Sequence, residues 1–176
     1  MNTANKLTIF RVILVPFFVL FMLCDITDYS RLIALILFVV ATITDHLDGA
    51  IARKYNMITS FGKFMDPIAD KLLVSSALIC LTSLGEMPAW AVIIIILREF
   101  AVSGIRLVAA DNGAVIAAAG WGKAKTVAQM VMIIIFLLKI PQLYILSQIS
   151  LYTSIILTVV SMVDYLIKNK SVIKFK

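Results

Sequence analysis

Residues 45–71 read DHLDGAIARKYNMITSFGKFMDPIADK, and this stretch places four aspartates inside an otherwise apolar chain. On an α-helix, residues three apart are separated by about 60° and residues four apart by about 40°. Asp45 and Asp48 would therefore share one helix face. Asp66 and Asp70 would share another. Paired carboxylates on two neighbouring helices predict a site for hard divalent cations.

Small residues and an arginine accompany both aspartate pairs. Gly49, Ala52 and Arg53 follow the first pair at three- and four-residue steps, and Gly62 lies one turn before Asp66. Small side chains let a ligand approach the backbone, and an arginine pairs with phosphate oxygens. The stretch therefore predicts a site for metal ions and a phosphorylated ligand. The alternative is that the aspartates only cap helices and solvate a loop.

The composition indicates a helical membrane protein. The 176 residues are 62% hydrophobic, with a mean hydropathy of +1.04, and a spanning helix needs about 20 mostly apolar residues. We therefore predict an all-α integral membrane protein: a bundle of six transmembrane helices with a short amphipathic N-terminal segment, in one domain over residues 1–176 and without a cleavable signal peptide. The six segments are Leu7–Cys24, Arg31–Arg53, Phe64–Leu84, Trp90–Ala109, Thr126–Leu138 with an extension upstream, and Leu146–Ile167.

The distribution of charge argues against nucleic acid as a partner and for a lipid bilayer. The net charge is +6. With the amino terminus in the cytoplasm, Arg31 and Lys139 alone among the 16 Lys and Arg residues fall on the far side. This positive-inside pattern predicts a multi-pass protein of the cell membrane, with both termini and the aspartates at the cytoplasmic face.

Three further features bear on the later segments. Helix-capping preferences predict that the third helix begins at Pro67. The spacing of Gly62, Asp66 and Asp70 along one helix face predicts an earlier start, which we favour. Glu99, Ser103 and Arg106 share one polar face, which indicates either function or an ion pair between Glu99 and an arginine that joins two helices. The last segment is predicted to carry little polarity before Asp164.

The fixed residues of the aspartate stretch resemble a known family signature. The pattern Asp45-x2-Asp48-Gly49-x2-Ala52-Arg53-x8-Gly62-x3-Asp66-x3-Asp70 resembles that of the CDP-alcohol phosphatidyltransferases at every fixed position and gap. The resemblance implies CDP-diacylglycerol as the donor and a two-metal site for Mg²⁺ or Mn²⁺. It also implies metal ligands at Asp45, Asp48, Asp66 and Asp70, with Asp70 as the catalytic residue that takes the acceptor's proton.

The same resemblance implies which residues bind the donor. Asn5-Lys6-Leu7-Thr8-Ile9-Phe10-Arg11 resembles the N-terminal Asn-x-Leu-Thr-x-x-Arg block of the phosphatidylglycerophosphate synthases within the family, although Ala4 replaces their common proline. A helix-capping role is the alternative for Asn5 and Thr8, and a simple turn is the alternative for Thr59. The implied contacts to CDP-diacylglycerol are Asn5, Thr8, Gly49, Ala52, Arg53, Thr59 and Gly62.

Two later blocks concern the acceptor. Arg98-Glu99-x3-Ser103-x2-Arg106 and Gly122-Lys123-Ala124-Lys125-Thr126-x2-Gln129 resemble the acceptor-side blocks of the phosphatidylglycerophosphate synthases. The implied acceptor is sn-glycerol 3-phosphate, with CMP released and phosphatidylglycerophosphate formed by a protein that, by family analogy, is a homodimer. The phosphate of this acceptor would bind to the basic residues Lys63, Arg98, Arg106, Lys123 and Lys125. The alternatives are a cardiolipin synthase, a phosphatidylinositol phosphate synthase and, outside the enzymes, a divalent-cation transporter.

Overall fold

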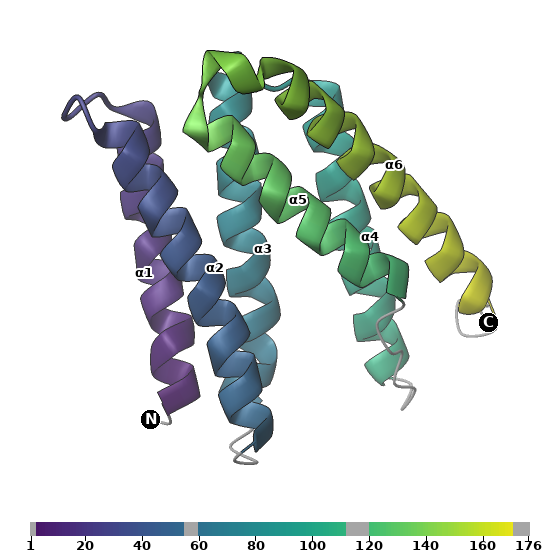
Figure 1. The fold of residues 1–176 in the computed structure, drawn as a ribbon. Helices are drawn as coiled ribbons and strands as arrows, with labels where there is room; N and C mark the ends of the chain where they lie inside the picture. The colour runs from purple at the N-terminus through teal and green to yellow at the C-terminus, as the bar shows by residue number, and fades with distance from the viewer. Residues whose placement is uncertain (1–2, 55–59, 112–119, 171–176) are drawn as a thin grey trace. The chain divides into compact units, whose positions relative to one another are not determined.

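The computed structural model describes residues 3–54, 60–111 and 120–170, and it describes side chains at residues 8–44, 68–69, 71–110 and 120–170. Six α-helices and one short 3-10 helix cover most of this part of the chain (Figure 1). They are α1 (Thr3–Leu23), α2 (Ser30–Lys54), α3 (Ser60–Ser83), α4 (Ala89–Asp111), α5 (Gly120–Leu138), η1 (Pro141–Leu143) and α6 (Tyr144–Lys168).

The predicted all-α class and the number of helices are confirmed for the described residues, whereas their crossing of a membrane stays a prediction. Each helix overlaps one predicted segment, with α1 and α3 ending one residue before the predicted end, and each ends where polar or turn-forming residues interrupt the apolar sequence. Gly85, with φ of 71°, lies in the turn between α3 and α4, and Pro141 opens η1. The amphipathic N-terminal segment is not a separate element, because α1 is continuous from Thr3. The early start of α3 is confirmed, since Ser60 precedes Pro67.

The chain divides into two compact units, residues 1–86 and 87–176. The single-domain assignment therefore stays a prediction. In the N-terminal unit, α1 packs against both α2 and α3 (Figure 1). Phe18 of α1 and Phe38 of α2 are fully buried and lie with ring centroids 6.0 Å apart. Aromatic rings at this distance stabilise the contact between their helices.

An ion pair fixes one end of the N-terminal unit. Arg31, at the start of α2, donates from Nη1 to Oε1 of Glu86 at 2.7 Å and from Nη2 to Oε2. Glu86 lies in the turn that follows α3. The paired geometry therefore joins the first turn of α2 to the end of α3 through a planar guanidinium–carboxylate contact.

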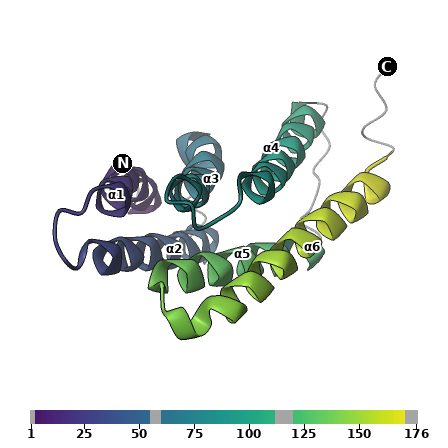
Figure 2. The ribbon, with the colours of Figure 1, turned by 90° about the horizontal axis from the view of Figure 1, so that it is seen from above.

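In the C-terminal unit, α6 packs against α5 along its length and also against α4, as the view from above shows (Figure 2). Its buried residues repeat at three- and four-residue steps and face these two helices. The opposite face is apolar and exposed at Ile145, Ile149, Ile156, Val163 and Ile167. Within the described residues, two stretches are long and apolar enough to cross a membrane, Gly120–Leu138 and Pro141–Lys168.

Candidate functional site

The four aspartates lie on consecutive helices of the N-terminal unit. Asp45 and Asp48 are in the last part of α2, and Asp66 and Asp70 are in the first part of α3. Residues 55–59 alone separate the two helices along the chain, so both pairs lie near the same connection. Their helical placement agrees with the prediction that each pair shares a helix face.

The described side chains cover part of the predicted donor site. Thr8 of α1 is 1% exposed and faces the interior of the N-terminal unit. Thr59 lies outside the described residues. The side chains of the four aspartates and of Asn5, Gly49, Ala52, Arg53, Gly62 and Lys63 also lie outside the described part. Their roles therefore stay predictions.

Arg11 is a buried charge that the donor-site prediction did not include. It lies one turn after Thr8 on α1 and is 1% exposed, so its side chain faces the interior and does not extend to a surface. Burying a guanidinium costs free energy unless polar groups surround it. Its position therefore indicates a polar environment beside Thr8 within the N-terminal unit. The signal in the sequence was a basic residue one turn into an apolar helix.

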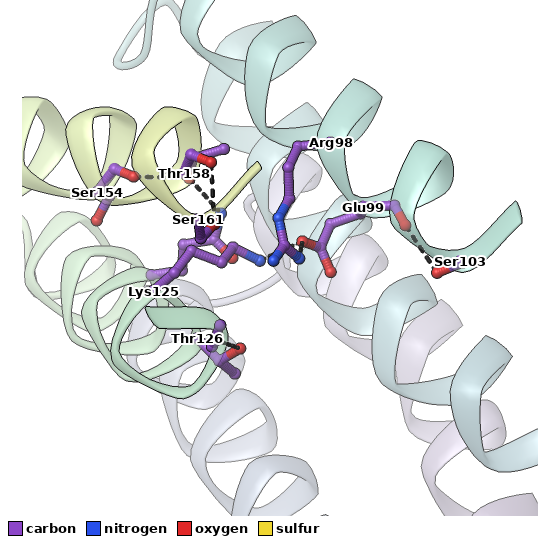
Figure 3. A network of polar contacts seen from close by, with 10 residues as sticks. Arg98, Glu99, Ser103, Lys125, Thr126, Ser154, Thr158 and Ser161 are labelled. Carbon is purple, nitrogen blue, oxygen red and sulfur yellow. Dashed lines mark hydrogen bonds and ion pairs between the residues drawn. The ribbon is translucent and has the colours of Figure 1, made fainter. Parts of the chain in front are cut away.

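The C-terminal unit contains a polar cluster formed by Arg98, Glu99 and Lys125 (Figure 3). Oε1 of Glu99 accepts a hydrogen bond from Nη1 of Arg98 at 3.0 Å and another from Nζ of Lys125. Glu99 is on α4 and Lys125 is on α5, so the carboxylate bridges two helices. The alternative of an ion pair between Glu99 and an arginine of another helix is met only in part, because Arg98 lies on the same helix as Glu99 and the residue that joins the two helices is Lys125.

The sequence brings these groups together by helical spacing and side-chain length. Lys125 is 1% exposed, although it carries a charge, because its long side chain crosses from α5 to α4. Ser103, one turn after Glu99, donates to the Glu99 carbonyl at 2.7 Å. The Ser103 hydroxyl therefore bonds to the backbone of its own helix. The polar face predicted for α4 then presents mainly Glu99 and Arg106.

Helix α6 contributes a row of buried hydroxyl groups that the sequence interpretation missed. Ser147, Ser154, Thr158 and Ser161 are all buried. Thr158 donates to the Ser154 carbonyl at 2.6 Å, and Nε2 of Gln129 on α5 lies 3.5 Å from the Thr158 hydroxyl. The prediction that the last segment carries little polarity before Asp164 is wrong. A hydroxyl that bonds to its own helix carbonyl is compatible with an apolar helix, and hydropathy therefore hides it.

The remaining acceptor-side residues lie at the surface of the unit. Lys123 is exposed at the start of α5, and Arg106 is exposed near the end of α4. The guanidinium carbon of Arg106 lies 5.7 Å from the ring centroid of Tyr165 on α6, a distance suited to a cation–π contact. Arg98 and Lys125 are thus brought together by Glu99, whereas Arg106 is held separately by an aromatic ring.

Paired aspartates thus lie on two consecutive helices and basic residues on two others, as the sequence resemblance implied. The family model of the CDP-alcohol phosphatidyltransferases matches residues 1–160. The chain therefore belongs to the CDP-alcohol phosphatidyltransferase family.

Curated relatives match over nearly the whole chain. A CDP-diacylglycerol–glycerol-3-phosphate 3-phosphatidyltransferase of Bacillus subtilis (strain 168) is 44% identical, covering 98% of this chain and 97% of the relative. One of Haemophilus influenzae is 42% identical, covering 94% of this chain and 91% of the relative. A probable phosphatidylglycerophosphate synthase of Mycobacterium tuberculosis (strain ATCC 25618 / H37Rv) is 42% identical, covering 93% of this chain and 79% of the relative.

Proposed function

We infer that this protein transfers a phosphatidyl group from CDP-diacylglycerol to sn-glycerol 3-phosphate, releasing CMP and forming phosphatidylglycerophosphate. The observation that carries this inference is the near full-length similarity, at 37–44% identity, to relatives named for that transfer. The acceptor-side residues agree with it, since basic groups on α4 and α5 suit a phosphorylated alcohol better than a neutral one. The reaction is a step of phospholipid biosynthesis.

We place the chain in the cell membrane as six transmembrane helices. The α-helices are 19 to 25 residues long, and about 20 residues cross a bilayer. Apolar side chains on the outer face of α6 suit contact with acyl chains. The excess of Lys and Arg on one set of connections favours both termini and the aspartates at the cytoplasmic face.

The donor side is assigned to the N-terminal unit. The four aspartates offer oxygen ligands alone, which suit Mg²⁺ or Mn²⁺. Asp45, Asp48 and Asp66 would be the core ligands, and Asp70 would complete a two-metal site. When bound, such ions neutralise charge on a diphosphate and orient its displacement. Around them, CDP-diacylglycerol would contact Asn5, Thr8, Gly49, Ala52, Arg53, Thr59 and Gly62.

Side chains of the protein take the proton of the acceptor hydroxyl and orient the acceptor. The acceptor hydroxyl attacks the lipid-side phosphorus, a new P–O bond forms, and the bond to the CMP oxygen breaks. Asp70 takes the proton from the hydroxyl as general base. Arg53 pairs with donor phosphate oxygens. The acceptor phosphate would be held by basic residues from the set Lys63, Arg98, Arg106, Lys123 and Lys125, and family resemblance favours a homodimer.

An acceptor comparison tests the proposal. Detergent-purified protein is incubated with CDP-diacylglycerol and, in separate reactions, with labelled glycerol 3-phosphate, phosphatidylglycerol or inositol phosphate. We expect CMP release and labelled lipid with glycerol 3-phosphate, loss of both in EDTA, and recovery with Mg²⁺ or Mn²⁺. Turnover with phosphatidylglycerol or inositol phosphate instead would assign the protein to another branch of the family. Metal uptake into vesicles without CMP release would indicate a transporter.

A further inference from the structure

Arg98 keeps unused hydrogen-bonding capacity in the cluster with Glu99 and Lys125. Its side chain is 11% exposed, and one hydrogen bond, from Nη1 to Glu99, accounts for one of its five N–H donors. Its Nε is buried and has no hydrogen-bond partner within the described residues. A buried guanidinium N–H group without a partner costs free energy until an acceptor reaches it. This guanidinium is therefore suited to an anionic ligand.

The helix opposite leaves room beside Arg98. Gly122 of α5 faces the guanidinium, and a Cβ atom there would lie 3.6 Å from Nη2 of Arg98. A longer side chain at position 122 would occupy the space beside Nη2. The glycine therefore keeps this edge of the guanidinium open, on the helix that also carries Lys125.

Glu99 contacts one cation on its own helix and one on the neighbouring helix α5. Lys125 is 1% exposed, and its ammonium group donates to Glu99 across the two helices. Arg98 is the residue next to Glu99 on the same helix and shares the same carboxylate oxygen. One carboxylate oxygen of Glu99 therefore contacts a cation of its own helix and a cation of α5 (Figure 3).

We propose that Glu99 is a positioning residue for the acceptor: it holds Lys125 in the contact between α4 and α5 and orients Arg98 to receive the phosphate of glycerol 3-phosphate. This rests on the proposed function for the identity of the acceptor. Lys125 then acts through the geometry of the cluster, and Arg98 is the member that contacts the ligand. An ion pair that only stabilised the helices would affect folding and would leave acceptor affinity unchanged.

The test separates acceptor binding from stability. Full-length wild type, Glu99→Gln and Glu99→Asp are purified in detergent, and kcat, the KM for glycerol 3-phosphate, the KM for CDP-diacylglycerol and the melting temperature are measured. We expect Glu99→Gln to raise the KM for glycerol 3-phosphate about tenfold, the effect of one charge-assisted hydrogen bond. The KM for CDP-diacylglycerol should stay constant, and Glu99→Asp should recover part of the loss.

Glu86→Gln is the matched control. It removes the carboxylate charge from the ion pair with Arg31, which has no assigned role in binding. It should lower the melting temperature and leave both KM values unchanged. An unchanged KM for glycerol 3-phosphate in folded Glu99→Gln overturns the proposal.

A double variant keeps the test decisive if Glu99→Gln does not fold. Glu99→Gln combined with Lys125→Met removes both charges of the contact between the two helices, so folding should recover. We expect the KM for glycerol 3-phosphate to stay raised, because Arg98 remains unoriented. A double variant that regains the wild-type KM overturns the proposal and leaves a purely structural pair.

A binding measurement distinguishes failure of this inference from failure of the proposed function. Inorganic phosphate is titrated into wild type and Glu99→Gln while the melting temperature is followed. Phosphate should raise the melting temperature of wild type more than that of the variant, even if the physiological acceptor is a different phosphorylated alcohol. Equal shifts overturn the role of Glu99, whereas absence of turnover with glycerol 3-phosphate overturns the proposed acceptor alone.

Discussion

Replacing Tyr165 tests whether an aromatic ring positions Arg106 for the acceptor. The ring is 2% exposed, and the Arg106 guanidinium carbon lies 5.7 Å from its centroid. Tyr165→Leu removes the ring and keeps an apolar side chain in the same space. Tyr165→Phe keeps the ring and removes the hydroxyl, so it is the matched control.

The structure sets the size of the expected effects. A cation–π contact at an exposed arginine contributes about 0.5–1 kcal/mol, and a tenfold change in affinity corresponds to about 1.4 kcal/mol. Tyr165→Leu should therefore raise the KM for glycerol 3-phosphate about two- to fivefold. The Tyr165 hydroxyl is buried without a hydrogen-bond partner in the described part of the chain. Removing an unsatisfied buried hydroxyl is neutral or stabilises a protein by about 1 kcal/mol, so Tyr165→Phe should melt at the same or a higher temperature.

The assay is steady-state formation of labelled lipid at saturating CDP-diacylglycerol with varied glycerol 3-phosphate, accompanied by thermal melting. A role of the ring in positioning Arg106 predicts a raised KM in the leucine variant and a wild-type KM in the phenylalanine variant. A raised KM in Tyr165→Phe would refute it, because the hydroxyl, and not the ring, would then be the group that matters. Equal KM values in all three proteins would remove Tyr165 from acceptor binding.

Two further predictions concern other contacts. The ion pair between Arg31 and Glu86 is partly buried and uses both carboxylate oxygens. A double-mutant cycle with Arg31→Gln and Glu86→Gln should therefore give a coupling free energy of about 1–2 kcal/mol in unfolding. A coupling free energy near zero would contradict this geometry. Gly122→Leu should displace the Arg98 guanidinium and raise the KM for glycerol 3-phosphate several-fold. Gly120→Leu is the control and should leave this KM unchanged, because a Cβ atom at position 120 would meet nothing within 4 Å. Matching KM values in the two variants would show that the acceptor does not use the space beside Arg98.

The helices could be predicted from the sequence because two simple signals agree. Apolar runs alternate with polar or turn-forming residues, and the observed helices follow them closely. The start of α3 needed a further signal, the four-residue spacing of Gly62, Asp66 and Asp70. That spacing outweighed the capping preference of Pro67, although Pro67 is the eighth residue of α3 and a proline there removes one backbone hydrogen bond.

The polar contacts between helices could not be predicted in the same way. Spacing along one helix showed that Glu99 lies on a polar face, but it did not show which cation from another helix would reach it. Lys125 crosses to α4 because its side chain is long, and that depends on how the helices pack. The buried hydroxyls of α6 were missed because Thr158 and Ser161 bond to carbonyl groups of their own helix, at 2.6 and 2.9 Å. Such internal bonds leave hydropathy almost unchanged.

CMP release by Asp70→Asn is the most direct test of the proposed phosphatidyl transfer at the aspartates of α2 and α3. The control is Asp164→Asn, which removes a carboxylate charge from an ion pair with Lys168 on α6. Loss of a general base lowers kcat about 10²- to 10⁴-fold. Asp70→Asn should therefore release CMP at or below about one hundredth of the wild-type rate, although it folds with the wild-type helical content. Asp164→Asn should remain active. Near-normal CMP release from folded Asp70→Asn would contradict the account.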